Sequence, residues 1–275
     1  MSIGFTIENS NVFNSIFAPV AKKFAEELHK KGVHIFFADQ DISQKFPRLI
    51  FGAHSNPVFW QNNKNKEDIF VNFEPVFLPN WKINNFSYIK LLKNSRVLDY
   101  SNKSNIILNQ TEFFKLPPLY NSEKIISKES DVLFVGSINE RRKLVFRQLF
   151  NDGINITLKF KIFGDDLLKQ IEKSKIFLDV NLYENSIFNI YRFCLCADTN
   201  TVYVGEAGDT SDYPEINELL GLTITKNTEE TSKIIKNLIS DKNHYLHLIK
   251  TQKKIAKKLD QRFKIFINSF SKEFH

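Results

Sequence analysis

The stretch DVLFVGSINERR, residues 131–142, determines how the second half of the chain is interpreted. A short apolar run ends at Gly136 and Ser137, and a helix-like segment with Arg141 and Arg142 in its first turn follows. This pattern predicts a strand, a tight turn and a helix N-terminus. Backbone N–H groups at a helix start bind anions, and arginines add charge and paired hydrogen bonds. The stretch therefore predicts a phosphate or diphosphate site, although it matches neither the dinucleotide fingerprint nor a P-loop.

Strand-like and helix-like segments alternate on both sides of this stretch. We expect strands at residues 3–7, 33–37 (buried), 49–51, 69–73, 96–99, 131–135, 157–163, 176–180, 201–204 and 222–224. We expect helices at residues 16–28, 88–93, 140–151, 165–173, 184–197, 215–220, 228–240 and 243–270. Such alternation predicts an α/β fold, with parallel sheets covered by helices on both faces. A polar linker after Pro117 and Pro118 suggests two Rossmann-like domains that face each other across a cleft, residues 1–120 and 121–275.

Composition sets limits on the class of protein. The 275 residues are 42% hydrophobic and 25% charged, which is ordinary for a globular protein, and the net charge is +7. That charge suits a phosphate-bearing ligand, nucleic acid or an anionic membrane, or it is a solvated lysine surface. No apolar run approaches the roughly 20 residues needed to span a bilayer. With no signal peptide apparent, and Cys194 and Cys196 expected as free buried thiols, we predict a cytoplasmic protein.

Several segments, in this order and spacing, resemble GT-B-type glycosyltransferases, in particular a group of bacterial and viral members. Residues 131–142 resemble the Gly-Ser-x-Asn-x-Arg-Arg opening of their nucleotide-sugar domain. Residues 181–192 resemble their Tyr-Glu-x-x-x-Phe-x-x-x-Arg helix, and residues 201–206 resemble the following strand, which ends in Glu. Residues 174–180 resemble their next conserved strand, and residues 49–54, 71–75 and 98–102 also resemble segments of that group. The resemblance implies two Rossmann-like domains, with an acceptor bound by the first and a nucleotide sugar by the second.

One feature departs from the family pattern. Many retaining members carry two glutamates eight positions apart after this strand, whereas Glu206 and Glu215 are nine apart. The stereochemical outcome therefore stays open. The resemblance implies transfer of a sugar from a nucleotide-diphosphate donor to a glycan or lipid-linked acceptor, without a metal or another cofactor. The alternative is a non-catalytic nucleotide- or sugar-binding module of a larger assembly.

The predicted donor site combines the anion-binding turn with the family motifs. Arg192 lies in an otherwise apolar segment, where an unpaired charge is costly to bury, so it needs a ligand or a structural partner such as Asp179 or Glu184. Adjacent arginines point about 100° apart on a helix, so Arg141 and Arg142 are not both expected to face a ligand, and either could be a surface charge. The predicted donor-binding residues are Gly136, Ser137, Arg141, Arg142, Tyr183, Glu184, Arg192 and Glu206. For Glu184 and Glu206 the alternatives are a helix cap and a loop carboxylate.

The first half supplies the candidates for acceptor chemistry. His54 and Glu74 each follow a predicted strand, and either could remove the proton of an acceptor hydroxyl. A structural role is the alternative for the histidine. Asp99 and Asn102 are predicted acceptor contacts, although Asp99 could equally cap the next turn.

Three further features suggest other partners. The Asp39-Gln-Asp41 pair resembles a metal-binding motif but lies far from the nucleotide signal, and His244 with His247 lacks a third ligand, so no metal is predicted. Residues 253–274 mix lysines with phenylalanines, which suits peripheral contact with an anionic membrane or packing back onto the first domain. The lysines are spread over the chain, so no nucleic-acid partner is predicted.

Overall fold

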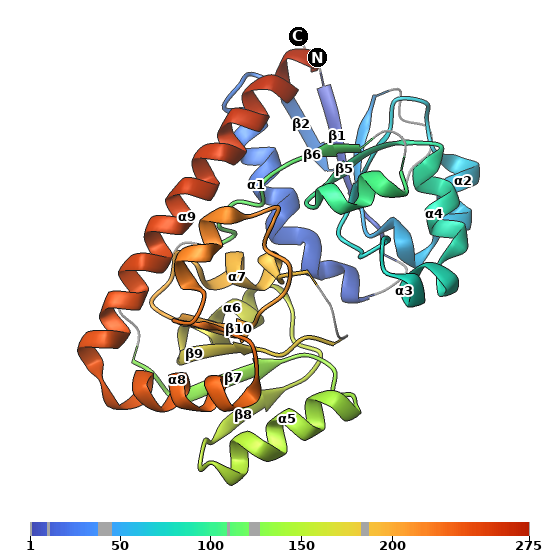
Figure 1. The fold of residues 1–275 in the computed structure, drawn as a ribbon. Helices are drawn as coiled ribbons and strands as arrows, with labels where there is room; N and C mark the ends of the chain where they lie inside the picture. Colours follow the sequence, from blue (N-terminus) through green and yellow to red (C-terminus); the bar gives the residue numbers. More distant parts are fainter. Residues whose placement is uncertain are drawn as a thin grey trace. The chain divides into compact units, whose positions relative to one another are not determined.

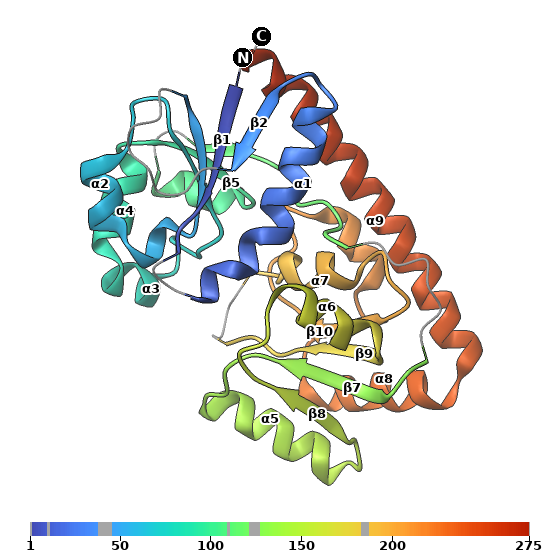
Figure 2. The same ribbon diagram turned by 180° about the vertical axis from the view of Figure 1, so that it is seen from behind.

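The computed structural model describes residues 2–9, 12–37, 46–108, 111–120, 127–182 and 187–274 (Figures 1 and 2). The chain forms two compact units. Unit 1 comprises Met1–Lys115 together with Arg262–His275, and unit 2 comprises Leu116–Gln261. The predicted division at residue 120 placed residues 262–275 with the second domain, whereas they pack within the first unit.

Unit 1 contains a six-stranded sheet in which all the strands are parallel. The order is β2-β1-β3-β4-β5-β6. Strand β2 is added on one side of β1 and the later strands on the other side, so the strand order reverses between β1 and β3. Its strands are β1 (Ser2–Ile7), β2 (His34–Phe37), β3 (Arg48–Phe51), β4 (Ile69–Asn72), β5 (Arg96–Asp99) and β6 (Thr111–Phe113). The helical segments are η1 (Val12–Phe17), α1 (Ala18–His29), η2 (Ala53–Ser55), α2 (Pro57–Asn63), α3 (Pro79–Asn84), α4 (Phe86–Lys93) and η3 (Asn102–Ile106).

Helices cover both faces of this sheet. One face packs against α2 and α4, where Trp60, Tyr88 and Leu92 join Ile50 and Phe70 in a buried cluster. The other face carries α1 and the last turns of the C-terminal helix α9 (Lys242–Phe270), which lie side by side in Figure 1. Both faces are apolar because β3 and β4 are buried along their whole length, as expected of central strands in a parallel sheet.

Unit 2 repeats the architecture with five parallel strands in the order β11-β10-β9-β7-β8. Helices α5 and α8 cover one face and α6 and α7 the other (Figure 1). Its strands are β7 (Ser130–Val135), β8 (Ile156–Lys159), β9 (Ser174–Asp179), β10 (Val202–Glu206) and β11 (Ile224–Thr225). Its helices are α5 (Glu140–Asn151), α6 (Gly164–Glu172), α7 (Ile190–Cys196), η4 (Pro214–Leu219) and α8 (Thr228–Ser240), followed by α9, which continues into unit 1 and leads to η5 (Ser271–Phe274). The predicted α/β architecture of two Rossmann-like units is confirmed.

The structure differs from several local predictions. The expected buried strand at residues 33–37 is β2, an edge strand of the sheet that the described residues form, and Phe37 is 67% exposed. The expected helix at residues 184–197 is the shorter α7, whose cap Asn189 accepts a hydrogen bond from Arg192 N–H. Helices α2 and α3, both of which begin at a proline, are not among the predicted elements.

The C-terminal segment is fixed to unit 1 by aromatic packing. The ring centroids of Phe263 and Phe24 lie 4.9 Å apart in an edge-on arrangement, and those of Phe266 and Phe114 lie 5.9 Å apart. Phe263, Phe270 and Phe274 are buried, so the predicted packing of the C-terminal helix onto the first domain is confirmed. Membrane contact by this helix stays a prediction that would depend on its lysines. Within the described residues, no helix combines the length and the apolar character that crossing a bilayer requires.

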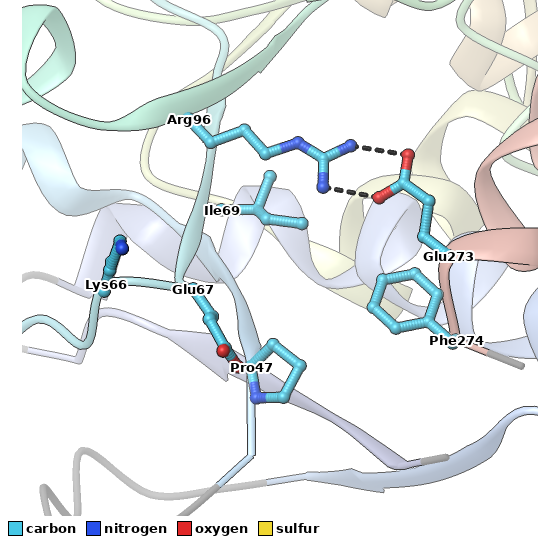
Figure 3. Close-up of a pocket in the computed structure, with 7 residues that line it drawn as sticks. All are labelled: Pro47, Lys66, Glu67, Ile69, Arg96, Glu273 and Phe274. Carbon is cyan, nitrogen blue, oxygen red and sulfur yellow. Dashed lines mark hydrogen bonds and ion pairs between the residues drawn. The ribbon is translucent and has the colours of Figure 1, made fainter.

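An ion pair fastens the very end of this segment. Arg96 donates to both carboxylate oxygens of Glu273 at 2.5 and 2.8 Å (Figure 3). Its Nε also donates to Glu112 at 2.7 Å. The contact borders an open cavity of about 300 Å³. Ile69 and Arg96, which line it, are the first residues of β4 and β5. Ligands of such sheets bind at the carboxyl ends of the strands. This cavity lies at the opposite edge, where β4 and β5 begin.

Two substitutions in one helix test the packing of the C-terminal segment. Phe263 is fully buried against Phe24, so Phe263→Ala should lower the free energy of unfolding by about 3–5 kcal/mol through lost burial and an unfilled cavity. Ile265 is 68% exposed, and Ile265→Ala should change it by less than about 0.5 kcal/mol. Urea denaturation measures both. Equal losses in the two variants would contradict this packing.

Candidate active site

The candidate site in unit 2 lies where the order of its strands reverses. Strands β7 and β9 are neighbours, but the chain goes from β7 to β8 at one edge of the sheet and from β9 to β10 toward the other edge. The loops that leave their carboxyl ends therefore diverge, and ligands of such sheets bind between them. Gly136 and Ser137 follow β7, and Val180 and Asn181 follow β9. The predicted anion-binding turn therefore lies at the reversal point of the sheet.

Gly136 and Arg192 meet at this point. Gly136 has a φ of +146°, a backbone conformation that residues other than glycine rarely adopt. A Cβ added there would lie 2.7 Å from Arg192 Nη2. The glycine is needed both for its backbone conformation and for the close approach of the guanidinium. The structure thus brings together the turn and the arginine that the sequence analysis expected to converge, and their binding role stays a prediction.

Arg192 is held by one acid and two aromatic faces. Its Nη1 lies 3.1 Å from Asp179 Oδ1, and its guanidinium lies over the rings of Phe134 and Phe177 at 5.6 and 5.9 Å. The side chain is 19% exposed, and that of Asp179 is 1% exposed. Neither atom of the ion pair makes an aligned hydrogen bond within the described part of the chain. Asp179 is therefore one of the two structural partners expected for Arg192. The other, Glu184, lies outside the described residues, as does Tyr183.

Arg142 ties the two loops together. Its Nε and Nη2 donate to Val180 O at 2.9 and 2.6 Å, and its Nη1 donates to Ser137 O at 2.7 Å. The residue is 5% exposed, and burial and the nearby charge of Arg192 lower its pKa to about 10. The sequence analysis weighed a ligand contact against a surface charge here. The structure shows a third arrangement, a buried link across the reversal point.

Arg141 faces a different partner. It donates from Nη1 to Asn181 O and from Nη2 to Glu206 Oε1, each at 2.8 Å. Glu206 Oε2 also accepts from Asn181 N–H at 2.7 Å. Glu206, a predicted donor-binding residue, therefore orients Arg141 at the carboxyl ends of β9 and β10. Each of its oxygens keeps a second lone pair for a ligand.

The remaining residues of this turn differ in exposure. Ser137 is exposed, so its hydroxyl is open to a ligand. Asn139 caps α5 by accepting from Arg142 N–H at 3.0 Å, and it donates to Leu182 O at 2.9 Å. The sequence analysis missed this role, although an asparagine directly before a helix that starts with Glu140 is a capping signal.

A second cluster occupies the carboxyl ends of β3, β4 and β5 in unit 1. His54 Nε2 lies 3.5 Å from Glu74 Oε1, and the two side chains are 25% and 22% exposed. Burial raises the pKa of Glu74, while His54 and a hydrogen bond from Trp81 act to lower it. The two candidate bases are therefore brought together as one pair.

Asn72 connects this pair to Asp99. It donates from Nδ2 to Asp99 Oδ2 at 2.7 Å and to Glu74 O at 3.0 Å, and it accepts from the Tyr88 hydroxyl at 3.0 Å. Asp99 is fully buried and also accepts from Ser101 N–H, which is the turn-capping alternative of the sequence analysis. Asn102, the other predicted acceptor contact, is exposed at the start of η3.

Metal ligands do not gather in either cluster. Among the described residues, no group of three or more His, Cys, Asp or Glu side chains is placed to hold a metal ion. The Asp39-Gln-Asp41 pair lies outside those residues.

Substituting Gly136 tests the close approach to Arg192. In Gly136→Ala the added Cβ displaces the guanidinium, so binding of pyrophosphate should weaken by roughly tenfold or more, as expected when a charged hydrogen bond is lost. Gly153→Ala is the control, because Gly153 also has a positive φ, +82°, but its added Cβ meets no described atom within 4 Å. Isothermal titration measures both variants. Equal affinity in the two would contradict the role of the Gly136 turn.

The raised pKa of Glu74 predicts a pH dependence of stability. Between the ordinary value of 4.5 and the raised value, the folded protein holds a proton that the unfolded chain has released. The contribution of protonated Glu74 to the free energy of unfolding is therefore fully present below the ordinary pKa, and it is lost as pH rises through the raised pKa. As pH rises above 4.5, Glu74→Gln should therefore lose less unfolding free energy than the parent. His54→Ala should move the loss to higher pH, and identical profiles for parent and Glu74→Gln would refute the assignment.

Comparison with known proteins supports the fold. No family model matches the chain. An uncharacterized protein of Acanthamoeba polyphaga mimivirus is 25% identical over 139 residues, which cover 46% of this chain and less than half, 44%, of that relative. T4 phage beta-glucosyltransferase in complex with UDP and Mn²⁺ superposes with a TM-score of 0.67 at 14% identity, over 100% of this chain and 99% of that one.

Two further solved structures share the architecture. HepE of Anabaena in complex with UDP-glucose has a TM-score of 0.55 at 13% identity, over 99% of this chain and 98% of that one. A mutant O-GlcNAc transferase of Thermobaculum terrenum has a TM-score of 0.54 at 10% identity, over 100% of this chain and 67% of that one. The protein thus has the GT-B-type fold of these glycosyltransferases, as the sequence resemblance predicted.

Proposed function

We propose that the protein is a glycosyltransferase that takes its sugar from a nucleotide-diphosphate donor. The observation that carries this proposal is the Arg192 guanidinium, placed against the Gly136 turn at the reversal point of the unit 2 sheet. The fold shared with T4 phage beta-glucosyltransferase and HepE, whose structures contain UDP or UDP-glucose, supports the same function.

The proposed chemistry explains why cations are needed there. The bond between the anomeric carbon and the diphosphate oxygen breaks, the acceptor oxygen bonds to that carbon, and the diphosphate leaves with added negative charge. Fixed positive charge at that position stabilises the transition state more than the bound substrate. Arg192, Arg141 and the exposed Ser137 are the proposed diphosphate contacts, and Glu206 is the proposed ribose contact. Tyr183 and Glu184 remain proposed contacts from the sequence motif.

We assign the acceptor step to unit 1. The acceptor hydroxyl must lose a proton as its oxygen attacks, and an imidazole next to a carboxylate suits that task. The 3.5 Å approach of His54 and Glu74 supports this assignment. Asp99, buried beneath this pair, would act through Asn72 rather than by touching the acceptor, and Asn102 is the exposed candidate contact.

A glycan or lipid-linked saccharide is the proposed acceptor, and the distribution of charge favours a second candidate. Residues 1–115 with 262–275 contain 17 Lys and Arg against 11 Asp and Glu, a net charge of +6, whereas residues 116–261 contain 21 against 20, a net charge of +1. The net positive charge thus lies mainly in the unit proposed to bind the acceptor. The lysines and arginines themselves are spread over both units, which is why the sequence alone predicted no nucleic-acid partner. Beta-glucosyltransferase, with the same fold, is a DNA modifying enzyme, so DNA is the second candidate acceptor.

Nucleotide binding and turnover test the proposal together. UDP, GDP or ADP should raise the Tm of the parent protein, and the matching nucleotide sugar should be slowly hydrolysed. Arg192→Ala should weaken binding by roughly tenfold or more through loss of a charged contact, whereas Arg147→Ala, which removes an exposed arginine of α5, should not. Binding without turnover for any acceptor would favour the non-catalytic module. No binding of any nucleotide diphosphate would refute the proposal.

Two added arms resolve the finer points. Metal-free transfer is proposed because arginines supply the positive charge, so turnover in EDTA should be unchanged. The comparison is needed because the T4 enzyme has been crystallised with Mn²⁺. Saccharide and duplex DNA acceptors are compared at two salt concentrations. Transfer to DNA with affinity that falls steeply with salt would select the second acceptor candidate.

A further inference from the structure

Tyr203 lies along its own strand in unit 2. Its side chain is fully buried, and its ring passes over Gly205, two residues further along β10 on the same face. A Cβ added at Gly205 would lie 2.4 Å from the Tyr203 hydroxyl and 2.6 Å from two ring atoms. The absence of a side chain at position 205 is therefore what lets the ring lie flat and reach beyond its own strand.

The hydroxyl of Tyr203 ends on Asp179. Gly205 and Asp179 are register partners across β10 and β9, and the hydroxyl donates to Asp179 Oδ2 at 3.0 Å. Burial, and then the charge of Asp179, raise the pKa of Tyr203 well above its ordinary value, so the hydroxyl stays protonated and keeps donating. The carboxylate of Asp179 thus has one oxygen fixed by Tyr203, and its other oxygen lies 3.1 Å from Arg192 Nη1.

This arrangement fixes which edge of the guanidinium is offered to a ligand. Asp179 holds Nη1, the rings of Phe134 and Phe177 lie against the guanidinium, and Nη2 points to the Gly136 turn. Without the Tyr203 hydroxyl, the carboxylate would lose the hydrogen bond at Oδ2, and the direction in which it holds Arg192 would be less well defined. Pre-oriented charge is what a site needs to stabilise a leaving group without further rearrangement.

We infer that Tyr203 and Asp179 are positioning residues that orient Arg192 toward the donor diphosphate, with Gly205 providing the space for the tyrosine ring. This inference rests on the proposed function, because it assigns the cause of Arg192's orientation at the same site. It also separates these two buried residues from the groups that touch the donor.

The test uses variants that remove one hydroxyl each. Tyr203→Phe keeps the ring, which packs against Phe188 and Phe193 at 5.6 and 5.7 Å, and should weaken UDP binding about 3- to 10-fold. Tyr245→Phe is the matched control, since its hydroxyl bonds Lys175 O and Asn200 O in the same unit, and it should leave UDP affinity unchanged. Uridine, which lacks the diphosphate, should bind parent and Tyr203→Phe equally.

A double-mutant cycle decides whether the effect passes through Arg192. In an Arg192→Ala background, Tyr203→Phe should have no further effect on UDP affinity. Asp179→Asn, which keeps the shape but removes the charge, should lose at least as much affinity as Tyr203→Phe. If the parent binds UDP and Tyr203→Phe binds it equally well, or loses the same factor without Arg192, the inference is overturned. If the parent binds no nucleotide diphosphate, the proposed function fails instead.

Discussion

The structure of unit 2 depends on holding one largely buried guanidinium, that of Arg192, at the point where the sheet reverses its strand order. A charge removed from water needs a counter-charge and polarisable neighbours, or the fold would lose more from desolvation than it gains from packing. Asp179 supplies the counter-charge, Phe134 and Phe177 supply aromatic faces, and Gly136 supplies the room. These residues come from β7, β9 and the turn after β7, so the same contacts that keep the charge buried also hold the carboxyl ends of two strands together.

The two units share one topology but carry different side chains near the carboxyl ends of their strands. Both sheets reverse between their first and third strands, which places diverging loops at the carboxyl ends. In unit 2 those ends carry arginines, and in unit 1 they carry His54, Glu74 and the buried Asn72–Asp99 pair. Cationic groups suit a leaving anion, whereas an imidazole beside a carboxylate suits the removal of a proton. The side chains at equivalent loops, and not the fold, therefore determine which half of a transfer reaction each unit could serve.

Much of the fold could be predicted because it rests on local apolar periodicity. Helices α5 and α8 and strand β5 match their predicted bounds, since their apolar residues recur at helical spacing or form a short run typical of a strand. The short helices α2 and α3 could not be found that way, since they span two turns or fewer and begin at proline. At the site, the meeting of Gly136 with Arg192 followed from motif order. The role of Arg142 did not, because its three carbonyl bonds depend on how two loops pack in space.

The pairing of Tyr203 with Asp179 shows where sequence reasoning stops. A buried tyrosine needs a partner for its hydroxyl, and a glycine two residues later on the same face leaves room for the ring, so the sequence Tyr203-Val-Gly205 already indicates a hydroxyl directed along the strand. The strand alone cannot indicate which acceptor waits there. That choice is made by the register of β10 against β9, which sets Gly205 opposite Asp179. A shift by one residue would set Gly205 opposite a residue whose side chain points to the other face of the sheet, and Arg192 would lose its orientation. The precision of the proposed donor site is therefore a property of strand register, and the residues that enforce it need not touch the donor.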